Sequence, residues 1–225
     1  MVPHQAPGAE HQALLPVPAI VLCGGASSRM GRPKALLDLG DETFLSHAVR
    51  ILHDAGADDV VVVTGTHDEE IRAALDAAPL ARVPGVRVVR NPDHALGQLT
   101  SLRIGLAVVD HPGVAAVVVA LVDHPFVRPE TVRLLIEAWT RTRAPVVRPR
   151  LRGRHGHPVV FGREVFDALR TAPVEAGARA VVRACGDRVL DLDTEDEGTC
   201  LDVDTPEDYV RAMEWWSRGS RGRGA

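Results

Sequence analysis

Cysteine is scarce in this sequence, and no cysteine-rich motif is present. The three cysteines, Cys23, Cys185 and Cys200, are scattered, with neither a CxxC spacing nor an even number. This pattern argues against a disulfide framework and against a zinc site, and it is typical of a reducing compartment. We therefore expect a cytoplasmic protein.

Long hydrophobic runs and a strong excess of charge are also missing. No apolar run reaches the roughly 18 residues that a membrane-spanning helix needs, so we expect no membrane partner. The net charge is −4, which gives no reason to expect a nucleic-acid partner. The opening stretch, MVPHQAPGAEHQALLPVP, lacks the basic and apolar regions of a secretory signal.

What is present is the composition of an ordinary globular protein. The chain has 225 residues, of which 45% are hydrophobic and 25% charged, enough to bury a large core. We predict a single domain over residues 17–216. Residues 1–16 are predicted to be a flexible arm, and the Gly/Arg-rich residues 217–225 a flexible tail.

Strand and helix patterns alternate along the chain. The predicted strands are residues 18–23, 59–64, 86–90, 114–122, 144–150, 157–161 and 189–192. The predicted helices are residues 42–55, 67–77, 97–110, 129–142, 163–171, 176–185 and 206–216. This alternation predicts an α/β fold, a three-layer α/β/α Rossmann-like domain with a mostly parallel, mixed sheet. The most apolar strand, 114–122, should be central, and ligands should bind at the carboxyl ends of the strands.

A glycine-rich loop directly follows the first predicted strand. It reads LCGGASSRMGRPK from Leu22 to Lys34. Glycines let the backbone approach a phosphate closely, and Arg29 and Lys34 add positive charge for a triphosphate. We interpret it as a nucleotide loop; the alternative, a flexible turn, does not need so long a segment. The nucleotide-binding residues predicted here are Leu22, Cys23, Gly24, Gly25, Ala26, Ser27, Ser28, Arg29, Met30, Gly31 and Lys34.

Two familiar phosphate loops do not match this segment. A Walker A loop needs Gly-Lys-Ser/Thr, whereas Gly31 is followed by Arg-Pro-Lys and Lys34 by Ala35. A dinucleotide fingerprint needs G-x-G-x-x-G and an acidic residue ending the second strand, which here ends at Thr64. An NAD-dependent oxidoreductase is therefore the weakest candidate.

The loop resembles the L-x-x-G-x-S-x-R-M-G-x-x-K signature of the MobA-like nucleotidyltransferases, a family that includes the molybdopterin guanylyl- and cytidylyltransferases. The similarity continues at Gly97–Leu102, Leu121–Val127, Gly156–Val159, Glu175–Arg179 and Asp202–Asp208, spanning about residues 18 to 214. The pattern is closest to the molybdenum cofactor cytidylyltransferase branch. One departure concerns the base. Cytidylyl members usually read L-A-A-G, whereas Leu22-Cys23-Gly24-Gly25 is nearer the guanylyl form.

Asp123 ends the most apolar predicted strand. A carboxylate there loses hydration unless it is paired or bound to metal. A helix cap is the alternative, but the next predicted helix begins only at Pro129. We interpret Asp123 as a Mg²⁺ ligand, in agreement with the metal-binding aspartate that the resemblance implies. Together with Arg29 and Lys34 it forms the predicted catalytic set.

The second metal carboxylate that the resemblance implies comes from Asp202 or Asp204. In this stretch Thr205 suits a helix cap, with Pro206 in the first turn and Asp208 completing a capping box. Asp204 can belong to that turn instead of the metal site. We rank Asp202 slightly ahead of Asp204.

Four further groups of residues complete the predicted site. The start of the helix at Gly97, Thr100, Ser101 and Leu102 suits the base or ribose, with ordinary capping an equal alternative. Thr64 and Asn91 are also predicted to bind the nucleotide. The basic loop Arg148–Pro158 suits a phosphorylated acceptor, with a solvated loop as the alternative, and its histidines lack zinc-site spacing. The predicted acceptor-binding residues are His124, Pro125, Arg154, Gly156, His157, Pro158 and Arg179.

These residues predict a Mg²⁺-dependent nucleotidyltransferase. A phosphorylated acceptor is already ionised and attacks the α-phosphorus of the triphosphate without a general base, releasing pyrophosphate. The resemblance implies CTP as donor, with GTP as the rival, molybdopterin as acceptor, and handover of the product to a molybdoenzyme or its chaperone. The alternatives are a sugar-1-phosphate or other small-phosphate nucleotidyltransferase, and a non-catalytic nucleotide- or cofactor-binding protein. The sequence indicates no oligomeric state.

Overall fold

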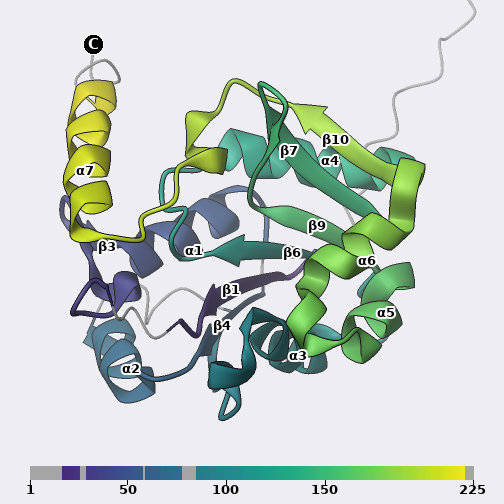
Figure 1. Ribbon diagram of the computed structural model, residues 1–225, viewed down its shortest axis with the longest axis horizontal. Helices are drawn as coiled ribbons and strands as arrows, with labels where there is room; N and C mark the ends of the chain where they lie inside the picture. Colours follow the sequence, from purple (N-terminus) through teal and green to yellow (C-terminus); the bar gives the residue numbers. More distant parts are fainter. Residues whose placement is uncertain (1–16, 26–28, 58, 78–84, 221–225) are drawn as a thin grey trace, which may run out of the picture.

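The computed structural model describes residues 17–25, 29–57, 59–77 and 85–220 (Figure 1). The predicted arm 1–16 lies outside these ranges, as do residues 221–225 of the predicted tail and Ala26, Ser27 and Ser28 of the glycine loop. No helix of the described part is long and apolar enough to cross a membrane.

The core of the fold is a mixed sheet of eight strands in the order β10-β7-β9-β6-β1-β4-β5, with β8 paired to β7. The strands are β1 (Ala19–Cys23), β4 (Val60–Thr64), β5 (Val86–Arg90), β6 (Ala116–Leu121), β7 (Val146–Leu151), β8 (Arg154–His155), β9 (Val159–Gly162) and β10 (Val189–Asp193). β1 pairs in parallel with both β4 and β6, whereas β9 is antiparallel to β6 and to β7. The prediction of a mixed, mostly parallel sheet with the 114–122 run at its centre is confirmed.

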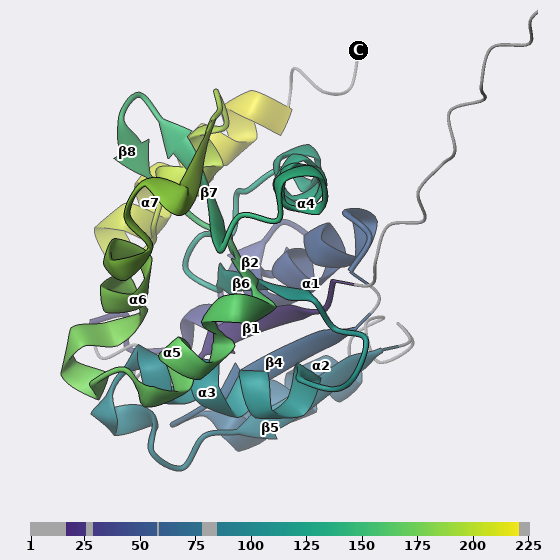
Figure 2. The ribbon, with the colours of Figure 1, turned by 90° about the vertical axis from the view of Figure 1, so that its right-hand side faces the viewer.

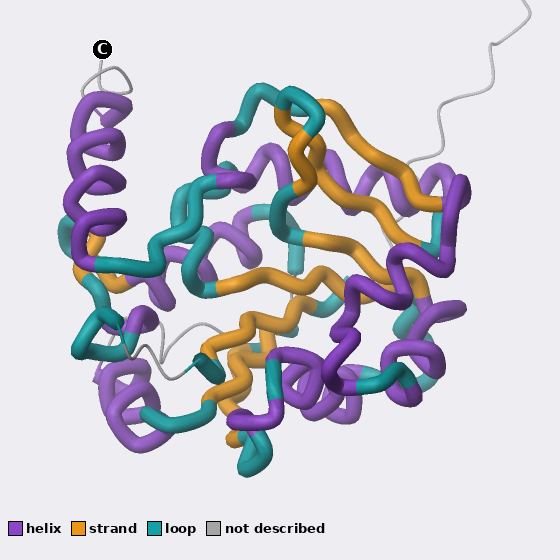
Figure 3. Tube along the Cα trace, viewed as in Figure 1, coloured by secondary structure: helices purple, strands orange, loops and turns teal. Residues whose placement is uncertain are grey.

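Helices cover both faces of this sheet, which gives the predicted three layers (Figures 2 and 3). One side holds α1 (Phe44–Asp54), α2 (Asp68–Ala77), α4 (Pro129–Thr142) and α7 (Pro206–Ser220), and the other α3 (Gln98–Val109), α5 (Phe166–Thr171) and α6 (Gly177–Cys185). Successive side chains of β1 point alternately to the two faces of the sheet. Ala19, Val21 and Cys23 pack into the first core, and Ile20 and Leu22 into the second. Because β1 is buried on both faces, its sequence is a continuous apolar run.

Some elements differ from the sequence prediction. A short hairpin of β2 (Asp38–Leu39) and β3 (Glu42–Thr43) precedes α1, and the 163–171 segment divides into a 3₁₀ turn, η4 (Arg163–Val165), and α5. The last helix continues to Ser220, past its predicted end at 216. The further 3₁₀ turns are η1 (Lys34–Leu36), η3 (His94–Leu96), η5 (Val174–Ala176), η6 (Gly186–Arg188) and η7 (Glu197–Cys200). Elements of two to four residues are too short to show a hydrophobic period.

A buried aspartate fastens the segment before α7 to the sheet. Asp196 is 3% exposed, and its carboxylate accepts hydrogen bonds from the Arg128 amide at 2.9 Å and the Thr131 hydroxyl at 2.7 Å, both at the start of α4. It also accepts from the Gly198 amide at 3.1 Å. Asp196 thus caps α4 from a distant part of the chain and holds the segment that leads to Asp204.

Candidate active site

Two cavities meet at the carboxyl edge of the sheet. The first has a volume of about 350 Å³ and the second about 990 Å³. The residues that line both cavities are Leu22, Gln98, Leu121, Asp123 and Asp204. Because the parallel strands β1 and β6 both end here, their last residues meet at this shared wall. A ligand in the first cavity and a ligand in the second would therefore meet at this wall.

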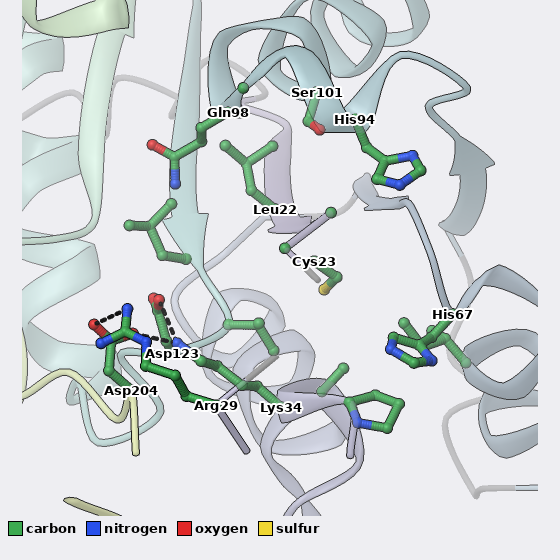
Figure 4. A pocket seen from close by; sticks show the side chains of 18 residues that line it. Leu22, Cys23, Arg29, Lys34, His67, His94, Gln98, Ser101, Asp123 and Asp204 are labelled. Carbon is green, nitrogen blue, oxygen red and sulfur yellow. Dashed lines mark hydrogen bonds and ion pairs between the residues drawn. The ribbon is translucent and has the colours of Figure 1, made fainter. Parts of the chain in front are cut away.

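The shared wall carries a cluster of opposite charges (Figure 4). The Lys34 ammonium lies 3.4 Å from Oδ2 of Asp123 and also contacts Oδ1 of Asp204. Arg29 lies 3.8 Å from the other oxygen of Asp204. The Lys34 side chain is only 15% exposed and that of Asp123 27%, so solvent screens their attraction less than on an open surface. The cluster thus places the Lys34 cation beside two carboxylates.

Asp123 is held in its charged form by these neighbours. Burial raises the pKa of its carboxyl, but the hydrogen bond and charge of His124, together with the charge of Lys34, outweigh burial, so the pKa lies below its usual value. The His124 ring nitrogen Nδ1 is 3.1 Å from the carboxylate. An ionised aspartate at a strand end is a good ligand for a hard cation.

Asp204 reaches this position through backbone contacts. The amide of Val203 donates to the carbonyl of Asp123 at 2.9 Å, and the predicted capping box follows directly. Oγ1 of Thr205 accepts from the Asp208 amide at 3.1 Å, and the Asp208 carboxylate accepts from the Thr205 amide at 2.8 Å. Asp202 is exposed and lines the second cavity. The structure therefore brings Asp204, rather than the preferred Asp202, into contact with Lys34.

Two carboxylates of this cluster are available as ligands for a divalent cation. Within the described ranges, no group of three or more His, Cys, Asp or Glu side chains is arranged to hold a metal ion. Asp123 and Asp204 offer oxygen donors on either side of a bound ammonium. Mg²⁺ characteristically takes one or two carboxylates and fills its remaining positions with water and substrate phosphates. The residues present fit such a site.

Gly24 is required by packing inside the nucleotide loop. A Cβ at this position would lie 2.7 Å from Oγ of Ser101. The Ser101 hydroxyl is itself held by the Asn91 amide at 2.9 Å. A Cβ on Gly65 would meet the Gly24 carbonyl at 2.6 Å and the His94 ring at 2.8 Å. Packing against Ser101 therefore explains a glycine at position 24, where the cytidylyl pattern has alanine, without reference to the nucleotide base.

The predicted nucleotide residues fall into four groups. Those lining the first cavity are Leu22, Cys23, Gly24, Gly25, Arg29, Lys34, Gly97 and Ser101. Met30, Gly31, Thr64, Asn91 and Thr100 line neither cavity, and Leu102 lines the second. Asn91 is 1% exposed and donates to the Thr100 hydroxyl at 2.8 Å, so these two side chains brace the start of α3. Ala26, Ser27 and Ser28 lie outside the described residues.

Two histidines that the sequence analysis missed line the first cavity opposite the charge cluster (Figure 4). Nε2 of His94 is 3.0 Å from the Thr66 hydroxyl, and its Nδ1 is 3.1 Å from the Asn91 carbonyl. His67 lies in the turn before α2, 3.2 Å from Glu70. Both follow closely on the carboxyl ends of parallel strands, β4 and β5, and that position was the clue available in the sequence.

The second cavity gathers most of the predicted acceptor residues. Those lining it are His124, Arg154, Gly156, His157 and Arg179, whereas Pro125 and Pro158 do not. Part of the basic stretch is neutralised internally, because Arg148 donates to Asp191 at 2.6 Å and Arg150 to Asp193 at 2.7 Å. A Cβ on Gly156 would collide with the Thr199 carbonyl, so this motif glycine permits close packing.

His157 is neutral at physiological pH. Burial is the main cause that lowers its pKa to about 4, and the charge of His124, whose ring centroid is 5.1 Å away, acts in the same direction. Asp123 and a hydrogen bond to the backbone of Val119 act in the opposite direction without restoring the usual value. His157 therefore adds a polar but uncharged surface to the cavity wall.

A comparison with protein families finds the MobA-like NTP transferase domain over residues 19–189. Among curated proteins, the chain is 31% identical over 210 residues to the nicotine blue oxidoreductase of Paenarthrobacter nicotinovorans. It is 24% identical over 199 residues to the molybdenum cofactor cytidylyltransferase of Escherichia coli K12. Each match covers 88% of this chain and 96% of the relative.

Solved structures agree with this similarity. The crystal structure of Rv0371c from Mycobacterium tuberculosis H37Rv has a TM-score of 0.75 and 32% identity, covering 88% of this chain and 98% of that one. The same protein in complex with manganese gives a TM-score of 0.70 and 30% identity, covering 90% and 100%. The predicted Rossmann-like nucleotidyltransferase fold is confirmed.

Proposed function

The chain belongs to the MobA-like NTP transferase family of nucleotidyltransferases, and we propose that it moves a nucleoside monophosphate from an NTP to a phosphorylated acceptor. Pyrophosphate is the second product. The observation that carries this proposal is that Lys34, which lines the first cavity, contacts Asp123 and Asp204, which line both cavities. A donor in the first cavity and an acceptor in the second would meet at this cluster.

The residues of the first cavity suit a nucleoside triphosphate. The backbone at Gly24 and Gly25 is open to close approach by a phosphate, and Arg29 and Lys34 supply the charge that the phosphates need. Burial raises the pKa of the Cys23 thiol far above its usual value, and the charge of Asp123 raises it further. Cys23 therefore forms a neutral wall and does not act as a nucleophile.

The acceptor phosphate enters from the second cavity. One of its ionised oxygens forms a bond to the α-phosphorus as the bond to the bridging oxygen of the β-phosphate breaks, and pyrophosphate carries away the electron pair. No general base is required, and Lys34 and Arg29 stabilise the charge that builds on the leaving group. The described residues contribute mainly positioning and charge.

We assign the metal site to Asp123 and Asp204, with Mg²⁺ as the physiological ion. Bound there, the ion would neutralise phosphate charge and align the phosphates. The manganese complex of Rv0371c supports a divalent metal in this family branch. Asp202, exposed on the second cavity, is the less favoured ligand.

We favour CTP as the donor and molybdopterin as the acceptor. The Gly97–Leu102 motif and the similarity to the E. coli cytidylyltransferase support this choice. GTP stays the rival donor, although the packing of Gly24 against Ser101 removes one reason to prefer it. The three cysteines are free thiols, in keeping with a cytoplasmic reaction and with handover to a molybdoenzyme or its chaperone.

A second candidate is an oxidoreductase, favoured by the 31% identity to the nicotine blue oxidoreductase. It would need a reduced nicotinamide nucleotide as hydride donor and a dye-like acceptor. The glycine loop lacks the G-x-G-x-x-G spacing of a dinucleotide fold, and the paired carboxylates on the shared wall have no role in hydride transfer.

The test is pyrophosphate release from CTP, GTP, ATP and UTP with Mg²⁺ and either molybdopterin or a sugar 1-phosphate as acceptor, run beside NADH oxidation with a dye acceptor. We expect release with CTP above the other nucleotides and no NADH oxidation. Release only with a sugar 1-phosphate would identify the small-phosphate transferase. Nucleotide binding without release from any acceptor would identify the non-catalytic alternative and overturn the proposal.

A further inference from the structure

The second cavity is electrically asymmetric. Asp123 and Asp204 lie on the shared wall, where Lys34 contacts both, and Asp202 also lines this cavity. α6 and the turn before it contribute Arg179 and Arg183 to the cavity lining against a single carboxylate, Glu175. An elongated ligand in this cavity would therefore meet an acidic, cation-binding end and a basic end.

Arg179 and Arg183 differ from most arginines of this protein in lacking a counter-ion. Within the described ranges, neither makes an ion pair or a hydrogen bond, and Glu175 does not pair with Arg179. Arg148 and Arg150, on the neighbouring strand, are both paired with aspartates of β10. Two arginines at i and i+4 of a helix repel each other. Both residues are exposed, so their charge is hydrated and open to an anion that enters the cavity.

The two arginines mark a path away from the reacting end. His124 touches Asp123 at 3.1 Å, and its ring centroid is 5.1 Å from that of His157, whose pKa responds to the charge of Arg179. Arg183 lies one helical turn further along α6, about 6 Å away. It also lines an outer depression together with Arg148. Arg183 thus lies where the second cavity meets this depression, whereas Lys34 lines the first cavity.

Between the two ends the cavity has an apolar wall. Leu99, Leu102, Phe161 and Val182 line it, and the first three of these are buried. Apolar side chains favour a flat hydrocarbon or aromatic body, which loses water on binding. The cavity volume of about 990 Å³ is ample for such a body with charged groups at both ends.

We propose that the acceptor carries a second anionic group remote from its reacting phosphate, and that Arg179 and Arg183 bind that group. The inference rests on the proposed function, because it takes the Lys34 end as the site of the reacting phosphate. It narrows the acceptor to molecules with a second anionic group set apart from the reacting phosphate. An acceptor with the phosphate as its only charge leaves the α6 arginines unused.

The test compares two probes that differ by one carboxylate, phenyl phosphate and 4-carboxyphenyl phosphate. Their dissociation constants are measured by calorimetry with Mg²⁺ and without nucleotide, so that no turnover is involved. We expect wild-type protein to bind the carboxylated probe about tenfold more tightly, as a charge-assisted contact provides. Arg183→Ala should reduce that advantage to less than about twofold, and Arg183→Lys should restore part of it.

The matched control is Arg188→Ala. Arg188 is 63% exposed and paired with Glu164, and it does not line the cavity, so its loss should leave the tenfold preference intact. Equal affinity of the two probes for wild-type protein overturns the inference. So does a preference that survives in both Arg179→Ala and Arg183→Ala. A normal probe preference without pyrophosphate release from any acceptor would sink the proposed reaction and leave the anion site standing.

Discussion

The ammonium nitrogen of Lys34 lies 3.4 Å from Oδ2 of Asp123, although 89 residues separate them in the chain. One belongs to the glycine loop after β1 and the other to the end of β6, and the parallel pairing of these strands brings them together. Asp204 completes the contact from the segment before α7. The candidate reaction centre thus combines three distant segments.

The choice between Asp204 and Asp202 can be tested by metal binding. Asp204→Ala should weaken binding of Mn²⁺, titrated in the presence of CTP, by at least about tenfold, because it removes an oxygen ligand beside Asp123. Asp202→Ala should change the affinity less than about twofold, since this exposed side chain is not in contact with Lys34. Electron paramagnetic resonance of free Mn²⁺ gives both values. The reverse order of the two effects would return the site to Asp202.

The close approach of Gly24 to Ser101 predicts a coupled pair of variants. Gly24→Ala should lower the free energy of unfolding by about 1–3 kcal/mol, because the added methyl would lie 2.7 Å from a hydroxyl that Asn91 holds in place. The same change in a Ser101→Ala background should cost clearly less, since the crowded oxygen is gone. Urea unfolding of the four proteins measures the coupling. Strict additivity would show that this contact does not require the glycine.

His157 predicts an acid-sensitive component of stability. Its pKa is lowered from 6.5 to about 4 in the folded protein. Between these two pH values the imidazole is protonated in the unfolded chain and neutral in the folded chain. Stability should be complete above pH 6.5 and fall by about 1–3 kcal/mol as the pH drops to 4. Denaturant unfolding in EDTA measures the trend. His157→Gln should remove this component, whereas the exposed His155→Gln should keep it; parallel losses in both variants would refute the assignment.

Asp196 predicts a link between stability and the metal site. Asp196→Ala should lower the free energy of unfolding by about 2–4 kcal/mol, because it leaves the amides of Arg128 and Gly198 and the Thr131 hydroxyl without their buried acceptor. It should also weaken Mn²⁺ binding, since the segment carrying Asp204 loses its anchor. Asp187→Ala, an exposed aspartate, should change either quantity little. A stable variant with unaltered metal affinity would show that the anchor is dispensable.

The sequence was sufficient for the layers of the fold and for part of the site. Continuous β-branched runs such as Val60–Val63 can only be buried on both faces, and this pattern predicted a parallel sheet. Asp123 could be singled out because a carboxylate ending a buried strand requires a partner. The capping box at Thr205 and Asp208 is local, so it too followed from the sequence.

What the sequence could not give depends on contacts between distant segments. The contact of Lys34 with Asp204 depends on how the segment before α7 lies against Asp123, where the Val203 amide donates to the Asp123 carbonyl, and no local pattern encodes this. Arg183 could not be linked to a cavity, because helical periodicity identifies a polar face without saying what lies opposite. Thr64 and Asn91 end strands as site residues often do, yet their side chains bond within the protein.

The most direct test of the account is the rate of Mg²⁺-dependent pyrophosphate release from CTP with molybdopterin in the Asp123→Asn variant. This substitution keeps the side-chain shape but removes the charge that pairs with Lys34 and that we propose as a metal ligand. We predict a loss of at least about a hundredfold relative to wild-type protein, with an unchanged melting curve and full activity in the exposed control Asp76→Asn. Near wild-type release from Asp123→Asn would contradict the assignment of this cluster as the reaction centre.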